Sequence, residues 1–103
     1  MEYRKLPHGT EKISILGLGT SSIGMAGEKE IQATVELALE RGINFFDMAS
    51  ANAAPFPAYG RAIAGARSNV YFQIHFGADY QSGTYGWTTQ LDTIQRSIDW
   101  QLS

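Results

Sequence analysis

The hydrophobic positions along the chain follow two spacings, one typical of buried strands and the other typical of helices. Three short apolar runs predict buried strands: residues 13–20, 43–49 and 69–77. Three other stretches predict helices: residues 28–41, 57–66 and 89–103. Strands and helices therefore alternate along most of the chain, and this order predicts a parallel sheet with right-handed crossovers.

The clearest helical pattern covers residues 28–41. Ile31, Val35 and Ala38 fall on one face there, and Gly42 is expected just past the C-terminus of the helix. This face should pack against the predicted sheet.

The last predicted helix is expected to begin with a capping box, Thr89-x-x-Asp92. Its apolar positions share one face and are expected to be buried: Leu91, Ile94, Ile98 and Leu102. That pattern runs on to Ser103 without a glycine cap or a polar tail. We therefore expect a truncated chain, cut within this third helix.

Two segments fall outside the alternation. Residues 1–14 carry two strand-like pieces around the turn Pro7-His8-Gly9-Thr10, which predicts a β-hairpin. Residues 78–87 predict a long polar loop. Its three large aromatic residues either cover a pocket as a lid or pack the loop onto the sheet: Tyr80, Tyr85 and Trp87.

A hairpin followed by three βα units indicates an α/β fold in a single domain, residues 1–103. Three units form either a small open sheet or a piece of a (β/α)₈ barrel, which needs eight units in roughly 250 residues. The alternation alone leaves both architectures open.

Composition narrows the functional class. The chain has 103 residues, a net charge of −2, 44% hydrophobic residues and no cysteine. The slight acidity argues against a nucleic-acid binder, and no apolar run approaches the roughly 20 residues that span a bilayer. The lack of cysteine removes disulfides and thiolate metal sites from this chain, and the two histidines do not suggest a metal pair. With no signal-peptide pattern at the N-terminus, we expect a cytoplasmic location and no membrane partner.

Two polar residues stand where parallel sheets build their sites. Asp47 follows the apolar run Ile43-Asn44-Phe45-Phe46, and His75 lies near the end of the next strand. The carboxyl ends of adjacent parallel strands meet at one edge, so we expect the two side chains to lie within reach of one bridging water. A carboxylate that caps a loop and a histidine bonded to backbone are the structural alternatives.

The glycines at the first strand do not complete a dinucleotide-binding fingerprint. After Gly17-Leu18-Gly19, the pattern G-x-G-x-x-G needs a glycine where Ser22 stands. The pattern therefore argues against a Rossmann site. The glycines either form a backbone-lined floor for a ligand or allow a tight turn.

Several segments together resemble the start of an aldo-keto reductase. They are Glu2-Tyr3-Arg4-Lys5-Leu6, Leu16-Gly17-Leu18-Gly19-Thr20 and Gly42-Ile43-Asn44-Phe45-Phe46-Asp47-Met48-Ala49. The stretches 73–80 and 85–89 resemble a divergent branch of that family, whose full-length members often carry a C-terminal iron–sulfur segment. The likeness covers essentially the whole chain in order and spacing.

The resemblance implies part of an eight-stranded TIM barrel that reduces a small carbonyl substrate with NADPH, using a catalytic Asp, Tyr, Lys and His. Asp47 matches the family Asp. Asn52 stands at the family Tyr position, and a Tyr-Gly pair follows only at Tyr59-Gly60. His75 stands at the Lys position, and the family His lies beyond residue 103.

The resemblance also implies roles for these residues. Asp47 would orient the site, and His75 would donate a proton, with Asn52 as the third candidate at the catalytic positions. Gly19 and Thr20 would line the NADP(H) site of a full-length parent. Most cofactor contacts in the family come from the second half of the barrel, so we expect the isolated chain to bind no cofactor and to be inactive.

Two non-enzymatic functions remain open. The chain is either a self-associating structural piece or a partner-binding piece that docks the missing portion of the barrel. Three βα units leave an open edge strand and an uncovered sheet face, so we expect a homo-oligomer. Fluorescence of added NADPH distinguishes the enzymatic hypothesis from these two.

Overall fold

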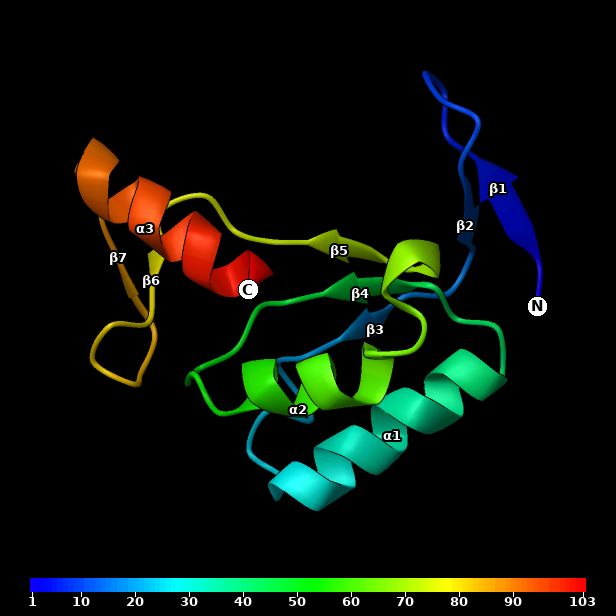
Figure 1. The fold of residues 1–103 in the computed structure, drawn as a ribbon, viewed down its shortest axis with the longest axis horizontal. Helices are drawn as coiled ribbons and strands as arrows, with labels where there is room; N and C mark the ends of the chain where they lie inside the picture. The colour runs from blue at the N-terminus through cyan, green and yellow to red at the C-terminus, as the bar shows by residue number, and fades with distance from the viewer.

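A three-stranded parallel sheet forms the centre of the molecule (Figure 1). The computed structural model describes residues 1–103. The strands follow one another in the order β3 (Leu18–Gly19), β4 (Phe45–Asp47) and β5 (Tyr71–Gln73). In this register Gly19 lies beside Asp47, and Asp47 lies beside Gln73. The mixed α/β fold with a parallel sheet confirms the predicted fold class.

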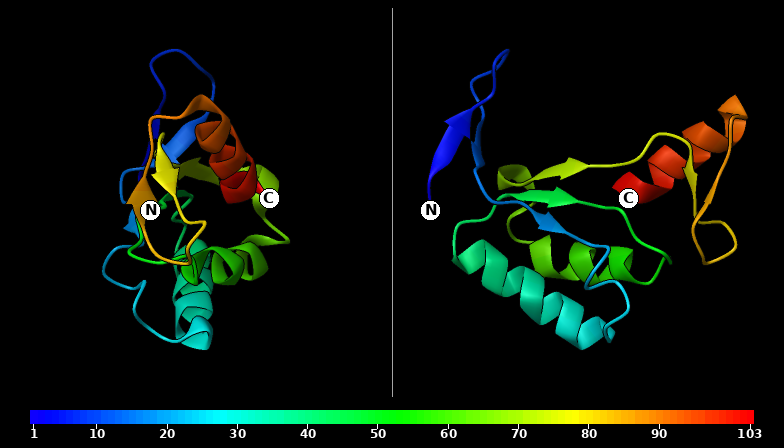
Figure 2. Two further views of the ribbon diagram at one scale, coloured as in Figure 1. Left: turned by 90° about the vertical axis from the view of Figure 1, so that its left-hand side faces the viewer. Right: turned by 180° about the vertical axis from the view of Figure 1, so that it is seen from behind.

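Two helices cover one face of this sheet, α1 (Glu28–Glu40) and α2 (Pro55–Ile63) (Figures 1 and 2). The core lies between these helices and the sheet. Its nine buried residues come from both helices, from β4, and from the positions directly after β4 and directly before β5: Ile31, Val35, Ala38, Phe46, Met48, Ala58, Tyr59, Ile63 and Val70. The predicted inner face of α1 is confirmed by this set.

Helix α1 ends where the sequence places a glycine. Gly42 has φ +87°, the left-handed region that glycine adopts without strain. Its N–H donates to Leu39 O at 2.9 Å, and Ile43 N–H donates to Ala38 O at 2.9 Å. These two bonds form a Schellman motif, which turns the chain from α1 into β4.

The predicted N-terminal hairpin is confirmed and closes the amino end of the sheet. Strands β1 (Tyr3–Lys5) and β2 (Lys12–Ser14) pair antiparallel. Ser14 N–H donates to Asn44 Oδ1 at 2.8 Å, and Asn44 N–H donates to Ser14 Oγ at 3.1 Å. These reciprocal bonds fix the hairpin to the start of β4.

The expectation of one continuous buried strand over residues 13–20 is wrong. The chain leaves the hairpin after Ser14, whose hydroxyl donates to Leu16 O at 2.7 Å. Ile15 and Leu16 are therefore in a bend, and they are 50% and 58% exposed. Strand structure resumes only at Leu18.

The segment 78–87 is a hairpin and not the predicted irregular loop. Strands β6 (Ala78–Asp79) and β7 (Gly86–Trp87) pair antiparallel beyond the carboxyl end of the sheet (Figure 1). Of the three aromatic residues in this segment, Tyr80 is buried, whereas Tyr85 and Trp87 are exposed. The expected packing of these side chains onto the fold therefore occurs for Tyr80.

A short 3₁₀ turn, η1 (Arg67–Asn69), precedes β5.

The last helix, α3 (Leu91–Leu102), corrects two expectations. The predicted capping box is wrong, because Gln90 is the N-cap and makes no side-chain capping bond. The predicted apolar face is only partly buried, because α3 packs on β6 through Ile94 and Ser97. Leu91 and Leu102, at the two ends of that face, are 76% and 51% exposed.

The longest helix, α1, has 13 residues. None of the helices has the combination of length and hydrophobicity that a membrane span requires.

Candidate functional site

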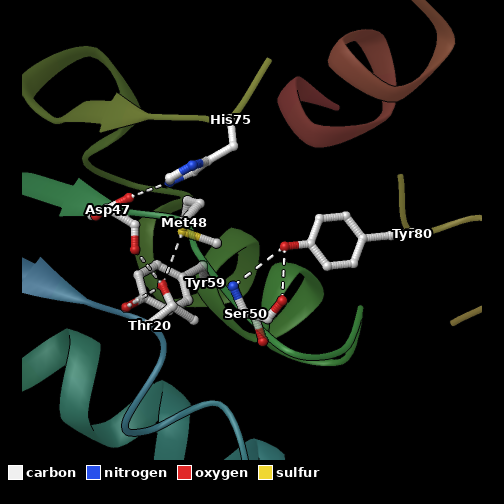
Figure 3. Close-up of polar contacts among 7 residues, drawn as sticks. All are labelled: Thr20, Asp47, Met48, Ser50, Tyr59, His75 and Tyr80. Carbon is white, nitrogen blue, oxygen red and sulfur yellow. Dashed lines mark hydrogen bonds and ion pairs between the residues drawn. The ribbon is translucent and has the colours of Figure 1, made fainter. Parts of the chain in front are cut away.

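Asp47 and His75 form a direct polar pair at the carboxyl end of the sheet (Figure 3). His75 Nε2 lies 2.8 Å from Asp47 Oδ1, closer than the bridging-water distance expected from the sequence. Their side chains are 40% and 39% exposed, so both groups remain reachable from solvent. The pair is therefore held together and also open to a reacting molecule.

The strand register explains this meeting. Asp47 is the last residue of β4, directly beside Gln73 at the end of β5. Side chains alternate between the faces of a strand, so His75, two residues past Gln73, continues on the same side. Met48 N–H donates to Gln73 O at 2.9 Å and extends the pairing beyond the strand ends.

Thr20 supports Asp47 from the neighbouring strand. Its backbone N–H and its hydroxyl both donate to Asp47 O, at 3.0 and 2.7 Å. The residue is fully buried. The hydroxyl that the resemblance placed against a cofactor is therefore used within the fold, where it fixes the backbone that carries the carboxylate.

Tyr59 is a residue of this site that the sequence analysis did not select. It comes from α2, is 2% exposed, and its hydroxyl lies 3.4 Å from Thr20 Oγ1. Burial raises the pKa of the Tyr59 phenol above 10.0; the Asp47 charge raises it further, and the Thr20 hydrogen bond lowers it in part. The phenol stays protonated at neutral pH. The Tyr59-Gly60 pair was the only sequence signal, and it lies outside the family spacing.

Asn52 is committed to loop structure. Its Oδ1 accepts a hydrogen bond from Ala54 N–H at 2.9 Å, and its Nδ2 donates to Gly24 O at 3.3 Å. These bonds join the segment before α1 to the start of α2. The side chain at the family Tyr position thus holds two loops together in this structure.

Gly19 leaves space at the site. A Cβ atom built there would meet nothing within 4 Å, although Gly19 is paired with Asp47 in the sheet. The open volume lies beside the strand end that carries the carboxylate. No group of three or more His, Asp or Glu side chains is placed to hold a metal ion.

A cavity of about 430 Å³ lies between α2, β5 and the end of α3. Met48, Tyr59, Phe72, Ile74 and Trp100 are among its lining residues. Asp47 and His75 are not among them, so this apolar cavity is separate from the polar pair.

Comparison with known proteins gives the following similarities. No protein-family model matches the chain. Over 50 residues it is 38% identical to Protein tas of Escherichia coli (strain K12) and to Protein tas of Shigella flexneri; the match covers 48% of this chain and 14% of each of those proteins.

Two solved structures from Pseudomonas aeruginosa share the fold, each assigned as an aldo-keto reductase. PA4992 superposes with a TM-score of 0.74 at 23% identity, and the second structure with a TM-score of 0.71 at 24% identity. Each match covers 97% of this chain and 40% of the solved one. The chain thus resembles the aldo-keto reductases and has the fold of one part of their TIM barrel, and the predicted likeness is confirmed.

Proposed function

We propose that this chain supplies the acid–base residues, His75 and Asp47, of an aldo-keto reductase-like oxidoreductase in which NADPH reduces a small carbonyl substrate. The observation that carries the proposal is the 2.8 Å contact between His75 Nε2 and Asp47 Oδ1 at the carboxyl ends of adjacent parallel strands. Sites in parallel α/β folds are built at this end. The shared fold with aldo-keto reductases supports the same reaction class.

His75 is the proton donor in this proposal. With Nε2 held by Asp47, its Nδ1 is the ring nitrogen left for a substrate oxygen. A protonated imidazole can donate a proton to the carbonyl oxygen as hydride reaches the carbonyl carbon. The Asp47 carboxylate orients the ring.

Tyr59 and Asn52 have supporting roles in the same proposal. Tyr59 is buried with a raised pKa, so its phenol does not ionise near neutral pH. Asn52 uses its side-chain amide to join two loops. The proton therefore comes from the residue at the family Lys position and not from a tyrosine.

The residues at the strand ends suit the ring end of a nicotinamide cofactor. Gly19 offers free space beside Asp47, and His75 offers a polar edge on the next strand. When bound, the nicotinamide supplies the hydride. Most cofactor contacts of the family that the chain resembles come from the second half of the barrel, and this chain spans 40% of the two solved structures. We therefore expect the isolated chain to be inactive and to bind NADPH too weakly to measure.

The test begins with the DNA reading frame beyond codon 103. If it continues, the longer protein is assayed for NADPH oxidation with small aldehydes. His75→Gln and Asp47→Asn should each lower kcat by about 100-fold, the usual scale for a general acid. His8→Gln, in the exposed N-terminal turn, is the matched control and should retain full activity. Undiminished turnover by His75→Gln would overturn the proposal.

A second candidate function, self-association without catalysis, rests on the sheet edges. In the order β3-β4-β5, both outer strands leave one edge unpaired, and the apolar 430 Å³ cavity opens beside β5. Unpaired edges and apolar patches favour association. Sedimentation at micromolar concentration distinguishes the two states: a folded species of 11.3 kDa argues against self-association.

A further inference from the structure

A buried tyrosine outside the proposed chemistry joins two segments that leave the site. The Tyr80 hydroxyl donates to Ser50 O at 2.9 Å and lies 3.3 Å from Ser50 N, as Figure 3 shows. Tyr80 is 5% exposed, and its ring packs against Phe56 and Trp100 at centroid distances of 4.9 and 5.8 Å. Its position is therefore well defined by contacts on both its ring and its hydroxyl.

Backbone bonds continue the same junction. Ala53 N–H donates to Gly83 O at 2.9 Å, and Tyr85 N–H donates to Ala51 O at 2.8 Å. An isolated antiparallel bridge joins Asn52 to Thr84. The loop 50–53 is thus bonded along its length to the tip of the β6–β7 hairpin.

Each of these two segments follows one member of the polar pair along the chain. The loop begins three residues after Asp47, and the hairpin begins three residues after His75. His75 itself lies outside β5, which ends at Gln73. Its carbonyl oxygen accepts a hydrogen bond from Ala78 N–H at 3.2 Å, so the hairpin fixes the backbone of His75.

We propose that Tyr80 is a positioning residue that keeps His75 against Asp47 by fastening the β6–β7 hairpin to the loop 50–53. The proposal deepens the proposed function, because the pair it holds is the acid–base pair of that function. Two hydrogen bonds make this connection: the Tyr80 hydroxyl bonds to Ser50 O, and Ala78 N–H, two residues before Tyr80, bonds to His75 O. Loss of the hydroxyl weakens this junction, although its backbone bonds remain, and gives His75 more freedom to move away from Asp47.

The Tyr80 phenol can keep its hydrogen bond to Ser50 through the neutral pH range. Burial raises the pKa of Tyr80 above 10.0; the Ser50 backbone bond lowers it in part, and Tyr85 raises it. The hydroxyl therefore keeps its proton and its donor role through the neutral range.

The decisive variant is Tyr80→Phe in the 103-residue chain, studied by NMR. It removes one oxygen and leaves the ring contacts in place. Tyr85→Phe is the matched control, because Tyr85 is 53% exposed and packs on Tyr80 at a centroid distance of 5.9 Å. The readouts are the exchange rate of the Ser50 amide and the ring N–H signal of His75, with His8 as the exposed internal reference.

In Tyr80→Phe we expect the Ser50 amide to exchange about 10-fold faster, the effect of losing one hydrogen bond of about 1.4 kcal/mol. The His75 ring N–H signal should weaken or disappear, because it is protected only while it is bonded to Asp47. Tyr85→Phe should change neither. A rise in Ser50 exchange with an unchanged His75 signal would overturn the proposal and leave Tyr80 a purely structural role.

Gly83→Ala supplies a second route if Tyr80→Phe does not fold. Gly83 has φ +87° and open space around its Cβ position, so alanine strains the turn without a steric clash. Gly83 O accepts the Ala53 N–H bond of the same junction, so the strained turn should speed exchange of the Ser50 amide and weaken the His75 signal. Faster Ser50 exchange with an unchanged His75 signal would show that the junction does not hold His75 and would overturn the proposal. Both readouts work without turnover, so a longer protein that lacks reductase activity would refute the proposed function and leave this inference standing.

Discussion

Thr20 and Asp47 lie 27 residues apart and are joined twice, because the N–H and the hydroxyl of Thr20 both donate to the carbonyl oxygen of Asp47. The two strands are therefore bonded at the point where the candidate site begins. The hydroxyl bond is an addition to the sheet ladder that only serine or threonine can make.

Thr20→Val should lower the free energy of unfolding by about 1–2 kcal/mol, because valine keeps the volume and removes the buried donor. Thr34→Val is the matched control. Its hydroxyl donates to Glu30 O on the exposed side of α1, and its loss should cost less than about 0.5 kcal/mol. Urea unfolding measures both variants, and equal losses would contradict the assignment of Thr20 as a buried support.

Stability should fall at high pH because two phenols are buried. The pKa values of Tyr59 and Tyr80 are raised in the folded chain, mainly by burial. The unfolded chain ionises first, near pH 10, so their contribution is complete below that pH and is lost as the pH rises through the folded pKa values.

Urea unfolding between pH 8 and 11 measures this loss. The wild-type free energy of unfolding should decline above about pH 10, and the double variant Tyr59→Phe/Tyr80→Phe should decline less steeply. Identical slopes in the two proteins would show that these phenols do not cause the decline.

Phe46→Ala should be among the most destabilising single changes in the chain. Phe46 is fully buried and contacts Tyr59 and Phe72 at centroid distances of 5.7 and 5.6 Å. Its truncation leaves a cavity and should cost about 3–5 kcal/mol. Phe76→Ala is the control, since Phe76 is 76% exposed and should cost less than about 1 kcal/mol. Thermal or urea unfolding of the pair checks the difference.

Glycine-to-alanine changes should act in opposite directions at two positions. Gly42 has φ +87°, and a Cβ there would lie 2.8 Å from Tyr3 Oη and 2.9 Å from Met1 Cβ, so Gly42→Ala should cost about 1 kcal/mol or more. Gly60 lies within α2 with nothing within 4 Å of its Cβ position. Gly60→Ala should stabilise the chain by about 0.5–1 kcal/mol. Melting temperatures that shift in the same direction would refute this interpretation.

The proximity of Asp47 and His75 could be predicted from the sequence. Two apolar runs end near Asp47 and His75, and parallel strands bring their carboxyl ends together. The inner face of α1 and its glycine stop also follow from local patterns, since Ile31, Val35 and Gly42 obey helical spacing and capping preferences. The features of α1 depend on neighbours in the chain, and the polar pair depends on the regular pairing of β4 with β5.

The remaining features depend on contacts between distant segments. Tyr59 joins the site through the packing of α2, and Tyr80 is buried where its ring packs on Phe56 and its hydroxyl bonds to Ser50. Neither contact leaves a periodic signal. Leu91 and Leu102 show the converse, because their spacing fits a buried face but Ile94 and Ser97 are the buried residues of α3.

The N-terminal hairpin and the reactive side chains lie at opposite ends of the sheet. Bonds from Ser14, Lys12 and Tyr3 join the hairpin to Asn44 and Gly42, at the end of the sheet opposite His75. Sequence change in the hairpin can therefore alter how firmly the chain holds its shape without displacing the reactive side chains. Substitutions meant to raise stability therefore belong in the hairpin end of the sheet, and substitutions meant to change the chemistry belong at its carboxyl end.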